Sequence, residues 1–136
     1  MNIFEALTEG DGTIGEVNIT AVLGFLLISS KNHSMGDSLL LELITIINDG
    51  QEVIKLENYS SSEITIEHTY ANRKSIDTQI KLINSNDKIF HRIIIENKIK
   101  DTAAVNEDQL QEYYIQECKE RELRYDTEDS SVTVLF

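Results

Sequence analysis

The chain has 136 residues, 40% hydrophobic and 7% aromatic, which is enough for one core and predicts a single domain over residues 1–136. Its 24 acidic and 12 basic residues give a net charge of −12, which by itself argues against a nucleic-acid partner. Cys118 is the only cysteine, so an intrachain disulfide and a cysteine-rich metal site are excluded, and a reducing cytoplasm fits. No apolar run is long enough to predict a membrane span, and the first residues do not resemble a signal peptide.

Two amphipathic helices are predicted in the first third of the chain. Residues 1–15 contain three glycines and few apolar residues, and we expect a lead-in segment there. Apolar residues then recur at helical spacing over residues 16–29, and again over residues 36–48. Asn48-Asp49-Gly50 is a stop and turn signal that ends the second helix.

The first strand is predicted after a polar stretch. Residues 51–62 are mostly polar, with a short strand allowed at 52–56. From Glu63 apolar and polar residues alternate, which predicts a half-exposed strand. One face of that strand is expected to carry four side chains: Ile64, Ile66, His68 and Tyr70.

The next two strands are expected to form a hairpin. Residues 74–84 alternate again, and the polar turn 84–87 leads into an apolar strand over residues 89–99. One face of the first strand carries isoleucines, and the other carries Asp77, Gln79 and Lys81.

The last third of the chain predicts a helix over residues 107–123 and a strand over 131–136. The apolar stripe of that helix consists of Leu110, Tyr113, Tyr114 and Cys118. A long helix between two strands predicts a crossover that joins parallel neighbours. The order α-α-β-β-β-α-β therefore predicts an α/β domain with a mixed sheet flanked by helices. Its final apolar strand ends abruptly, which suggests a truncated chain.

An acid and a lysine follow three consecutive isoleucines in the strand over 89–99. Side chains at i and i+2 of a strand share a face, so Glu96 and Lys98 are expected side by side, near Asp77 of the hairpin partner. Carboxylates are hard oxygen ligands for Mg²⁺, and a lysine can orient a metal-bound water for attack on a phosphodiester. The alternative is a surface ion-pair cluster at a strand end.

This pattern, Asp followed by Glu-x-Lys at the end of an apolar strand, resembles that of the PD-(D/E)XK nuclease superfamily. One branch of that superfamily carries Gln-x-x-x-Tyr on the next helix, and Gln109 and Tyr113 have this spacing. The resemblance implies that both residues lie near the site and help to bind substrate. The structural alternatives are a capping partner of Asn106 for Gln109 and a core position for Tyr113.

The front of the chain also resembles this branch, and the likeness covers residues 14–136. An acid on the first core helix often joins the metal site in the superfamily, and Glu16 is the matching position. The alternative for Glu16 is an exposed residue of the first helical turn. His33 matches a histidine of the branch, and its alternative is a loop histidine that caps a helix. In the family more chain usually follows the last strand.

The resemblance implies a restriction-endonuclease-like fold and metal-dependent hydrolysis of DNA phosphodiester bonds. Mg²⁺ or Mn²⁺ would be held by Asp77, Glu96 and the Asn97 carbonyl, with Glu16 as a further ligand, and Lys98 would position the water. Two rivals remain: an inactive nuclease-like scaffold that binds a protein through its acidic surface, and a fragment of a larger nuclease. A homodimer or an additional protein domain is left open as partner.

Positive charge is concentrated in residues 71–100. This segment holds seven of the twelve basic residues against three acids. We therefore expect it to form the nucleic-acid face, with Lys81 and Lys88 among the residues that contact phosphate. The alternative is an ordinary hairpin with solvated lysines.

Overall fold

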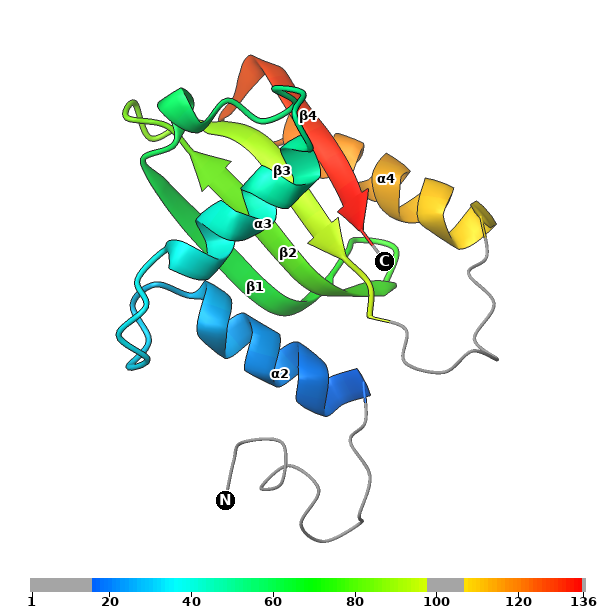
Figure 1. Cartoon of the computed structure of the whole chain (residues 1–136). Coiled ribbons are helices and arrows are strands. Elements are labelled where there is room, and N and C mark those ends of the chain that lie inside the picture. The colour runs from blue at the N-terminus through cyan, green and yellow to red at the C-terminus, as the bar shows by residue number, and fades with distance from the viewer. Residues whose placement is uncertain (1–15, 98–106, 136) are drawn as a thin grey trace, which may run out of the picture.

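A computed structural model of the chain describes residues 16–97 and 107–135. The order of helices and strands is the predicted one (Figure 1), and a short 3-10 helix precedes the first strand. The elements are α2 Glu16–Leu27, α3 Ser38–Asn48, η1 Leu56–Asn58, β1 Ser61–Thr69, β2 Ser75–Ile83, β3 Ile89–Ile95, α4 Glu107–Glu122 and β4 Asp126–Leu135. The short strand allowed at residues 52–56 is wrong, because that segment forms turns that lead into η1.

The sheet has the strand order β1-β2-β3-β4. β1 pairs with β2 and β2 with β3 in antiparallel hairpins, whereas β3 and β4 are parallel, as the crossover through α4 predicts. Ile93 lies between Ile80 of β2 and Thr133 of β4. Strand β3 is thus central, and the run of isoleucines is buried because both faces of the sheet are covered.

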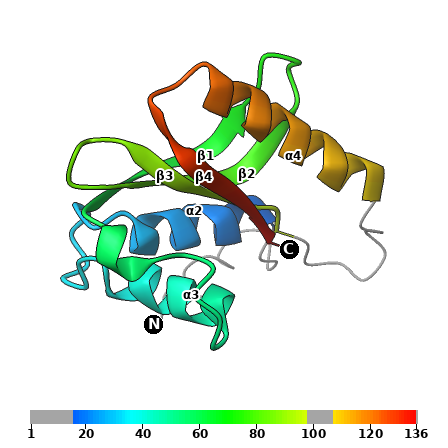
Figure 2. The same ribbon diagram turned by 90° about the horizontal axis from the view of Figure 1, so that it is seen from above.

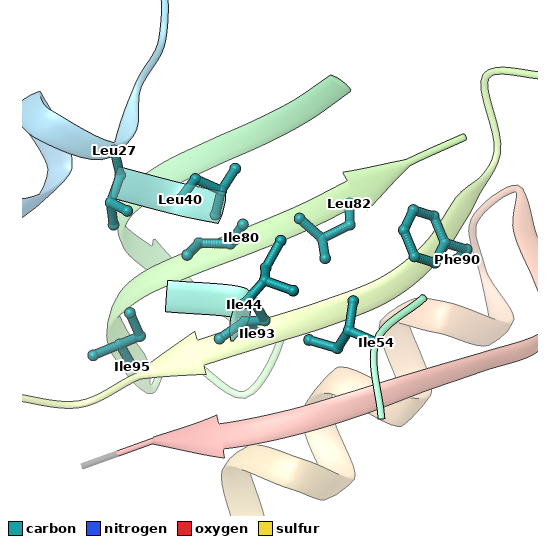
Figure 3. Close-up of a cluster of buried hydrophobic side chains, with 9 residues drawn as sticks. All are labelled: Leu27, Leu40, Ile44, Ile54, Ile80, Leu82, Phe90, Ile93 and Ile95. Carbon is teal, nitrogen blue, oxygen red and sulfur yellow. The ribbon is translucent and has the colours of Figure 1, made fainter. Parts of the chain in front are cut away.

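Helices α2 and α3 cover one face of the sheet and α4 covers the other (Figure 2). The main apolar core lies on the α2–α3 face (Figure 3). Its buried members are Leu27, Leu40, Ile44, Ile54, Ile80, Leu82, Phe90, Ile93 and Ile95. Helix α2 approaches β1 closely at Gly24, where an added Cβ would collide with the side chain of Ile66.

The α4 face has a different character. The side chains of α4 that are buried against the sheet are Tyr113, Gln116 and Glu117, whereas Tyr114 is 46% exposed. The predicted apolar stripe is therefore wrong at Tyr114. The physical reason is that α4 packs on polar side chains of β2 and β3, so its buried stripe is polar as well.

The predicted face of β1 is also wrong in part. Ile64 packs against the main core, and Ile66 lies at Gly24 of α2, but His68 and Tyr70 contact α4. The side-chain alternation reverses at Glu67, whose φ is +54°. A left-handed residue rotates the chain, so the side chains before and after it point to opposite faces.

Two further boundaries bear on the site. Strand β3 ends at Ile95, so Glu96 and Asn97 follow the strand and do not continue it to residue 99 as predicted. Within residues 16–97 and 107–135, no helix combines the length and apolar character that a membrane crossing requires.

Candidate active site

Asp77 and the Glu96-Asn97 segment meet at one end of the sheet. Thr78 of β2 pairs with Ile95 of β3, so the residue before Thr78 and the residues after Ile95 are neighbours. The backbone N–H of Asn97 donates a hydrogen bond to Asp77 Oδ2 at 2.6 Å. Glu96 is buried, with 8% of its surface exposed. The predicted approach of the two acidic segments is thus present in the structure.

Helix α2 is tied to the same segment. The side-chain amide of Asn97 donates a hydrogen bond to Thr20 Oγ1 at 2.7 Å, and Thr20 is buried. Glu16 begins α2 four residues earlier, one helical turn from Thr20, and its side chain lies outside the described residues. Thr20 was not predicted from the sequence. Its position one turn after an expected metal ligand was the only available indication.

The oxygen atoms of this segment suit a hard divalent cation. The Asp77 and Glu96 carboxylates and the Asn97 carbonyl are the donor types that Mg²⁺ and Mn²⁺ prefer. The part of the chain that the structure describes contains no group of three or more His, Cys, Asp or Glu that could hold a metal ion. The fit is therefore that of two carboxylates and one carbonyl, which suits an ion that keeps several water ligands. Lys98 lies outside the described residues.

Gln109 and Tyr113 border the start of β2. Gln109 Nε2 donates to the Tyr113 hydroxyl at 2.7 Å, and Tyr113 is buried against Ile76, the neighbour of Asp77. A groove of about 420 Å³ lies beside them. It is lined by Lys74, Ser75, Asp108, Gln109, Glu112 and Tyr113. Tyr113 thus belongs to the core and to the wall of a groove at the start of β2, where Ser75 lies two residues before Asp77.

These features were compared with known proteins. A family model described as the PD-(D/E)XK nuclease superfamily matches residues 1–136. The chain belongs to the PD-(D/E)XK nuclease superfamily. The fold agrees with this family, since it is a mixed sheet flanked by helices, with Asp77 of one strand beside Glu96 and Asn97, which follow the next. No curated protein and no solved structure gives a match.

The expected nucleic-acid face needs correction in this PD-(D/E)XK protein. Lys81 is buried and its ammonium lies 3.0 Å from Glu63, and Arg92 is fully buried. Neither side chain can reach a phosphate, so the prediction for Lys81 is wrong. Lys88 and Arg73 are exposed, and Lys74 pairs with Glu112 at 2.6 Å on the rim of the groove.

A buried ionic cluster between the sheet and α4 was not predicted from the sequence. Arg92 Nε and Nη2 donate to the two carboxylate oxygens of Asp126 at 3.0 Å each, and Nη1 donates to Glu117 at 3.4 Å. Glu117 also accepts from the Tyr70 hydroxyl at 2.9 Å and from Gln79 at 2.7 Å. The available indication was the polar residues at alternate positions of central strands, because a polar side chain that is buried there needs a hydrogen-bonding partner.

This cluster shifts the pKa values of its members. Burial alone would lower the pKa of Arg92, but the hydrogen bonds and charge of Asp126 and the charges of Glu117 and Glu120 outweigh burial and raise it. Burial and the adjacent Glu117 carboxylate raise the pKa of Tyr70 well above its usual range. Both groups are therefore held in their protonated forms, the guanidinium charged and the phenol neutral.

His33 acts within its loop. Its Nε2 donates to the Ile28 carbonyl at 2.9 Å, just after α2, and its Nδ1 accepts from the Met35 N–H at 3.0 Å. The Phe25 ring packs against its ring edge-on. The contacts of His33 are thus those of a histidine that closes the turn between α2 and α3, as the structural alternative predicts.

Proposed function

We propose that this protein is a metal-dependent nuclease that hydrolyses DNA phosphodiester bonds in the cytoplasm. The observation that carries the proposal is the 2.6 Å hydrogen bond from the Asn97 N–H to Asp77, in a chain of the PD-(D/E)XK nuclease superfamily. This bond joins the acid of one strand to the Glu-x-Lys segment of its neighbour. It uses one oxygen of Asp77 and leaves the other for a cation.

Each residue then has a defined task. A divalent ion, when bound, supplies charge for the developing anion and lowers the pKa of a water molecule. Asp77, Glu96 and the Asn97 carbonyl would hold it, with Glu16 as the further acid. Lys98 would orient the attacking water and offset charge at the scissile phosphate. Gln109 and Tyr113 would hold the nucleotide beside the groove, so that the phosphate stays in line for attack.

Metal binding is the first test. An ion that binds only the folded state adds about 1.4 kcal/mol of stability at roughly tenfold excess over its Kd, which raises Tm by several degrees for a chain of this size. We expect Mg²⁺ or Mn²⁺ to raise the Tm of the wild type, and to do so much less in Asp77→Asn or Glu96→Gln. Without metal, both variants should be slightly more stable, because a repulsion between carboxylates is removed.

The matched control is Glu112→Gln, which removes a half-buried acid of α4 that pairs with Lys74. This variant should keep the full metal response. Equal responses in all four proteins would mean that the ion senses only the overall acidity of the chain, and the metal site would be refuted.

Cleavage is the second test. Lys98→Ala should abolish Mg²⁺-dependent nicking of plasmid DNA or degradation of linear DNA, while circular dichroism and Tm stay at wild-type values. Persistent cleavage in a Lys98→Ala preparation purified in the same way would exclude the assigned role of Lys98.

The second candidate is an inactive nuclease-like scaffold that binds a protein partner. The net charge of −12 favours it, as does the burial of Lys81 and Arg92, which removes two cations from the surface. This candidate replaces the first if the wild type neither responds to metal nor cleaves DNA.

A further inference from the structure

Glu67 has a backbone conformation that is foreign to a strand. Its φ is +54°, whereas strand residues have φ well below zero. Among the described residues, four other non-glycine residues have positive φ, and all four lie in turns or at a helix end. Those four are Ser34, Asp49, Arg73 and Asp87. Glu67 alone in this set lies within a strand, where glutamate has no intrinsic preference for the left-handed region.

The side-chain directions of β1 reverse at this residue. Ile66 is directed at Gly24 of α2, whereas His68 makes a 2.7 Å contact with Glu120 of α4 on the opposite face of the sheet. In a regular strand these two side chains, at i and i+2, would share a face. The left-handed residue between them therefore lets one edge strand supply side chains to both layers of helices.

Strand β2 shows the same reversal directly opposite. Ile76 packs with Tyr113 under α4, whereas Ile80 belongs to the core under α2 and α3. The pairs Ile66–Thr78 and His68–Ile76 flank the position where Glu67 faces Asp77. No regular pair forms between Glu67 and Asp77. The irregularity is thus shared by the two strands.

Asp77 lies at this reversal, and its direction follows from it. Its carboxylate reaches the neighbouring strand end and accepts the Asn97 N–H at 2.6 Å. A side chain in a regular strand stands roughly perpendicular to the sheet, toward one layer of helices. Asp77 instead reaches the segment that follows β3, where Glu96 and Asn97 lie.

We propose that Glu67 is a positioning residue for Asp77, an inference that rests on the proposed function of Asp77 as a metal ligand. Its left-handed backbone, and not its carboxylate, aims Asp77 at the Asn97 N–H and leaves the second oxygen of Asp77 for the cation. The Glu67 side chain is exposed and is not needed for this task. Residues that orient metal ligands typically change metal affinity about 10- to 100-fold when they are altered.

The test compares substitutions of Glu67 that are compatible with the left-handed backbone conformation with one that is not. Glycine and asparagine tolerate positive φ, whereas the β-branched valine does not. Glu67→Gly and Glu67→Asn should keep the metal-induced rise in Tm. Glu67→Val should weaken metal binding about 10- to 100-fold. Thr65→Val, which places the same β-branched residue two positions earlier in β1, is the control for valine in this strand and should keep the full response.

A second readout follows Asp77 without any metal. In NMR spectra the Asn97 amide should show a through-hydrogen-bond coupling to the Asp77 carboxylate carbon in the wild type, in Glu67→Gly and in Glu67→Asn, and this coupling should be lost in Glu67→Val. A wild type that shows the amide coupling but no metal response would refute the proposed metal site and support the positioning role. A Glu67→Val protein with lower Tm but an intact metal response and amide coupling would overturn the positioning role.

Two further outcomes decide the remaining cases. Loss of metal binding in both Glu67→Gly and Glu67→Asn would overturn the inference, because the carboxylate itself would then be required. If Glu67→Val does not fold, the glycine variants at positions 67 and 65 still test the proposal. Glu67→Gly should keep or raise Tm because it relieves a strained φ, whereas Thr65→Gly should lower it. Equal losses at both positions would show that Glu67 is an ordinary strand residue and would refute the proposal.

Discussion

The face of the sheet under α2 and α3 is filled with aliphatic side chains, whereas the face under α4 holds a guanidinium among three carboxylates. Leu40 and Ile44 of α3 meet Ile80 and Ile93 on the first face. On the second, Arg92 lies within 4 Å of Glu117, Glu120 and Asp126, and its side chain is fully buried.

The difference shows how each helix is fixed. Burial of aliphatic surface depends on area and tolerates small shifts, whereas hydrogen bonds to a guanidinium fail beyond a few tenths of an ångström. The ionic cluster therefore sets where α4 lies along the sheet. Because Gln109 and Tyr113 belong to the same helix, the cluster also sets where they stand relative to Asp77.

Breaking the ionic cluster should have the largest effect. Arg92→Met leaves Glu117 and Asp126 buried without their cation, and removal of one partner of a buried ion pair costs about 4 kcal/mol. Urea unfolding should give this loss, and the double variant with Glu117→Gln should recover part of it. A loss below about 1 kcal/mol would mean that the cluster is open to water.

A cavity in the aliphatic face should cost somewhat less. Leu40→Ala removes a fully buried side chain, and such truncations cost about 3 kcal/mol in the folding free energy. Its neighbour Leu41, 37% exposed, is the matched control and should lose much less on truncation to alanine. Equal losses in urea unfolding would contradict the assignment of the two sides of α3.

The aliphatic face has a polar exception, which pH should reveal. Burial lowers the pKa of His91 to about 4. The unfolded chain, with an ordinary histidine pKa near 6.5, therefore binds more protons between these values, so stability falls as pH drops from about 6.5 to about 4. From pH 7.5 to pH 5 the expected loss is about 2 kcal/mol. His91→Gln should lose less over that range in urea unfolding at the two pH values; an equal loss would place the titrating group elsewhere.

A substitution at Gly24, where α2 approaches β1 on the aliphatic face, should have the smallest effect on stability. Alanine in a helix is favoured over glycine by about 1 kcal/mol, but a Cβ at position 24 collides with Ile66 and overpacking outweighs that gain. We expect Gly24→Ala to lose about 1 kcal/mol in the wild-type background and to gain stability in an Ile66→Ala background, which leaves only the Cβ of position 66, 4.0 Å from the added Cβ. A loss in both backgrounds would mean that Ile66 is not the obstacle.

The helices and strands could be predicted from the sequence wherever a periodic apolar pattern packs against a single apolar layer. Helix α3 and the isoleucines Ile93 and Ile95 of β3 are such cases, because burial on the aliphatic face follows from spacing alone. The buried stripe of α4 could not be predicted, since Glu117 becomes a buried residue only once Arg92, Gln79 and Tyr70 are beside it in space. Propensity assigns a glutamate on a helix to the surface.

The candidate site likewise has one part that could be predicted from the sequence and one part that could not. The approach of Asp77 to the segment after Ile95 follows from the hairpin of β2 and β3, which is local in the sequence. The bond from Asn97 to Thr20 joins residues 77 positions apart. No spacing rule contains it. The left-handed φ of Glu67 is likewise absent from any pattern, because nothing in glutamate favours it and the surrounding structure imposes it.

The parallel pairing of β3 with β4 also sets an order of events during synthesis. Arg92 meets Asp126 only after 34 further residues have been made, while the hairpins of β1, β2 and β3 can already form. Until then the α4 face of the unfinished sheet is open to water. That face bears Gln79, Lys81 and Arg92, which water hydrates well. An aliphatic surface in the same place would promote aggregation of the nascent chain. The face that α4 covers last is therefore the one whose temporary exposure to water carries the smaller risk of aggregation.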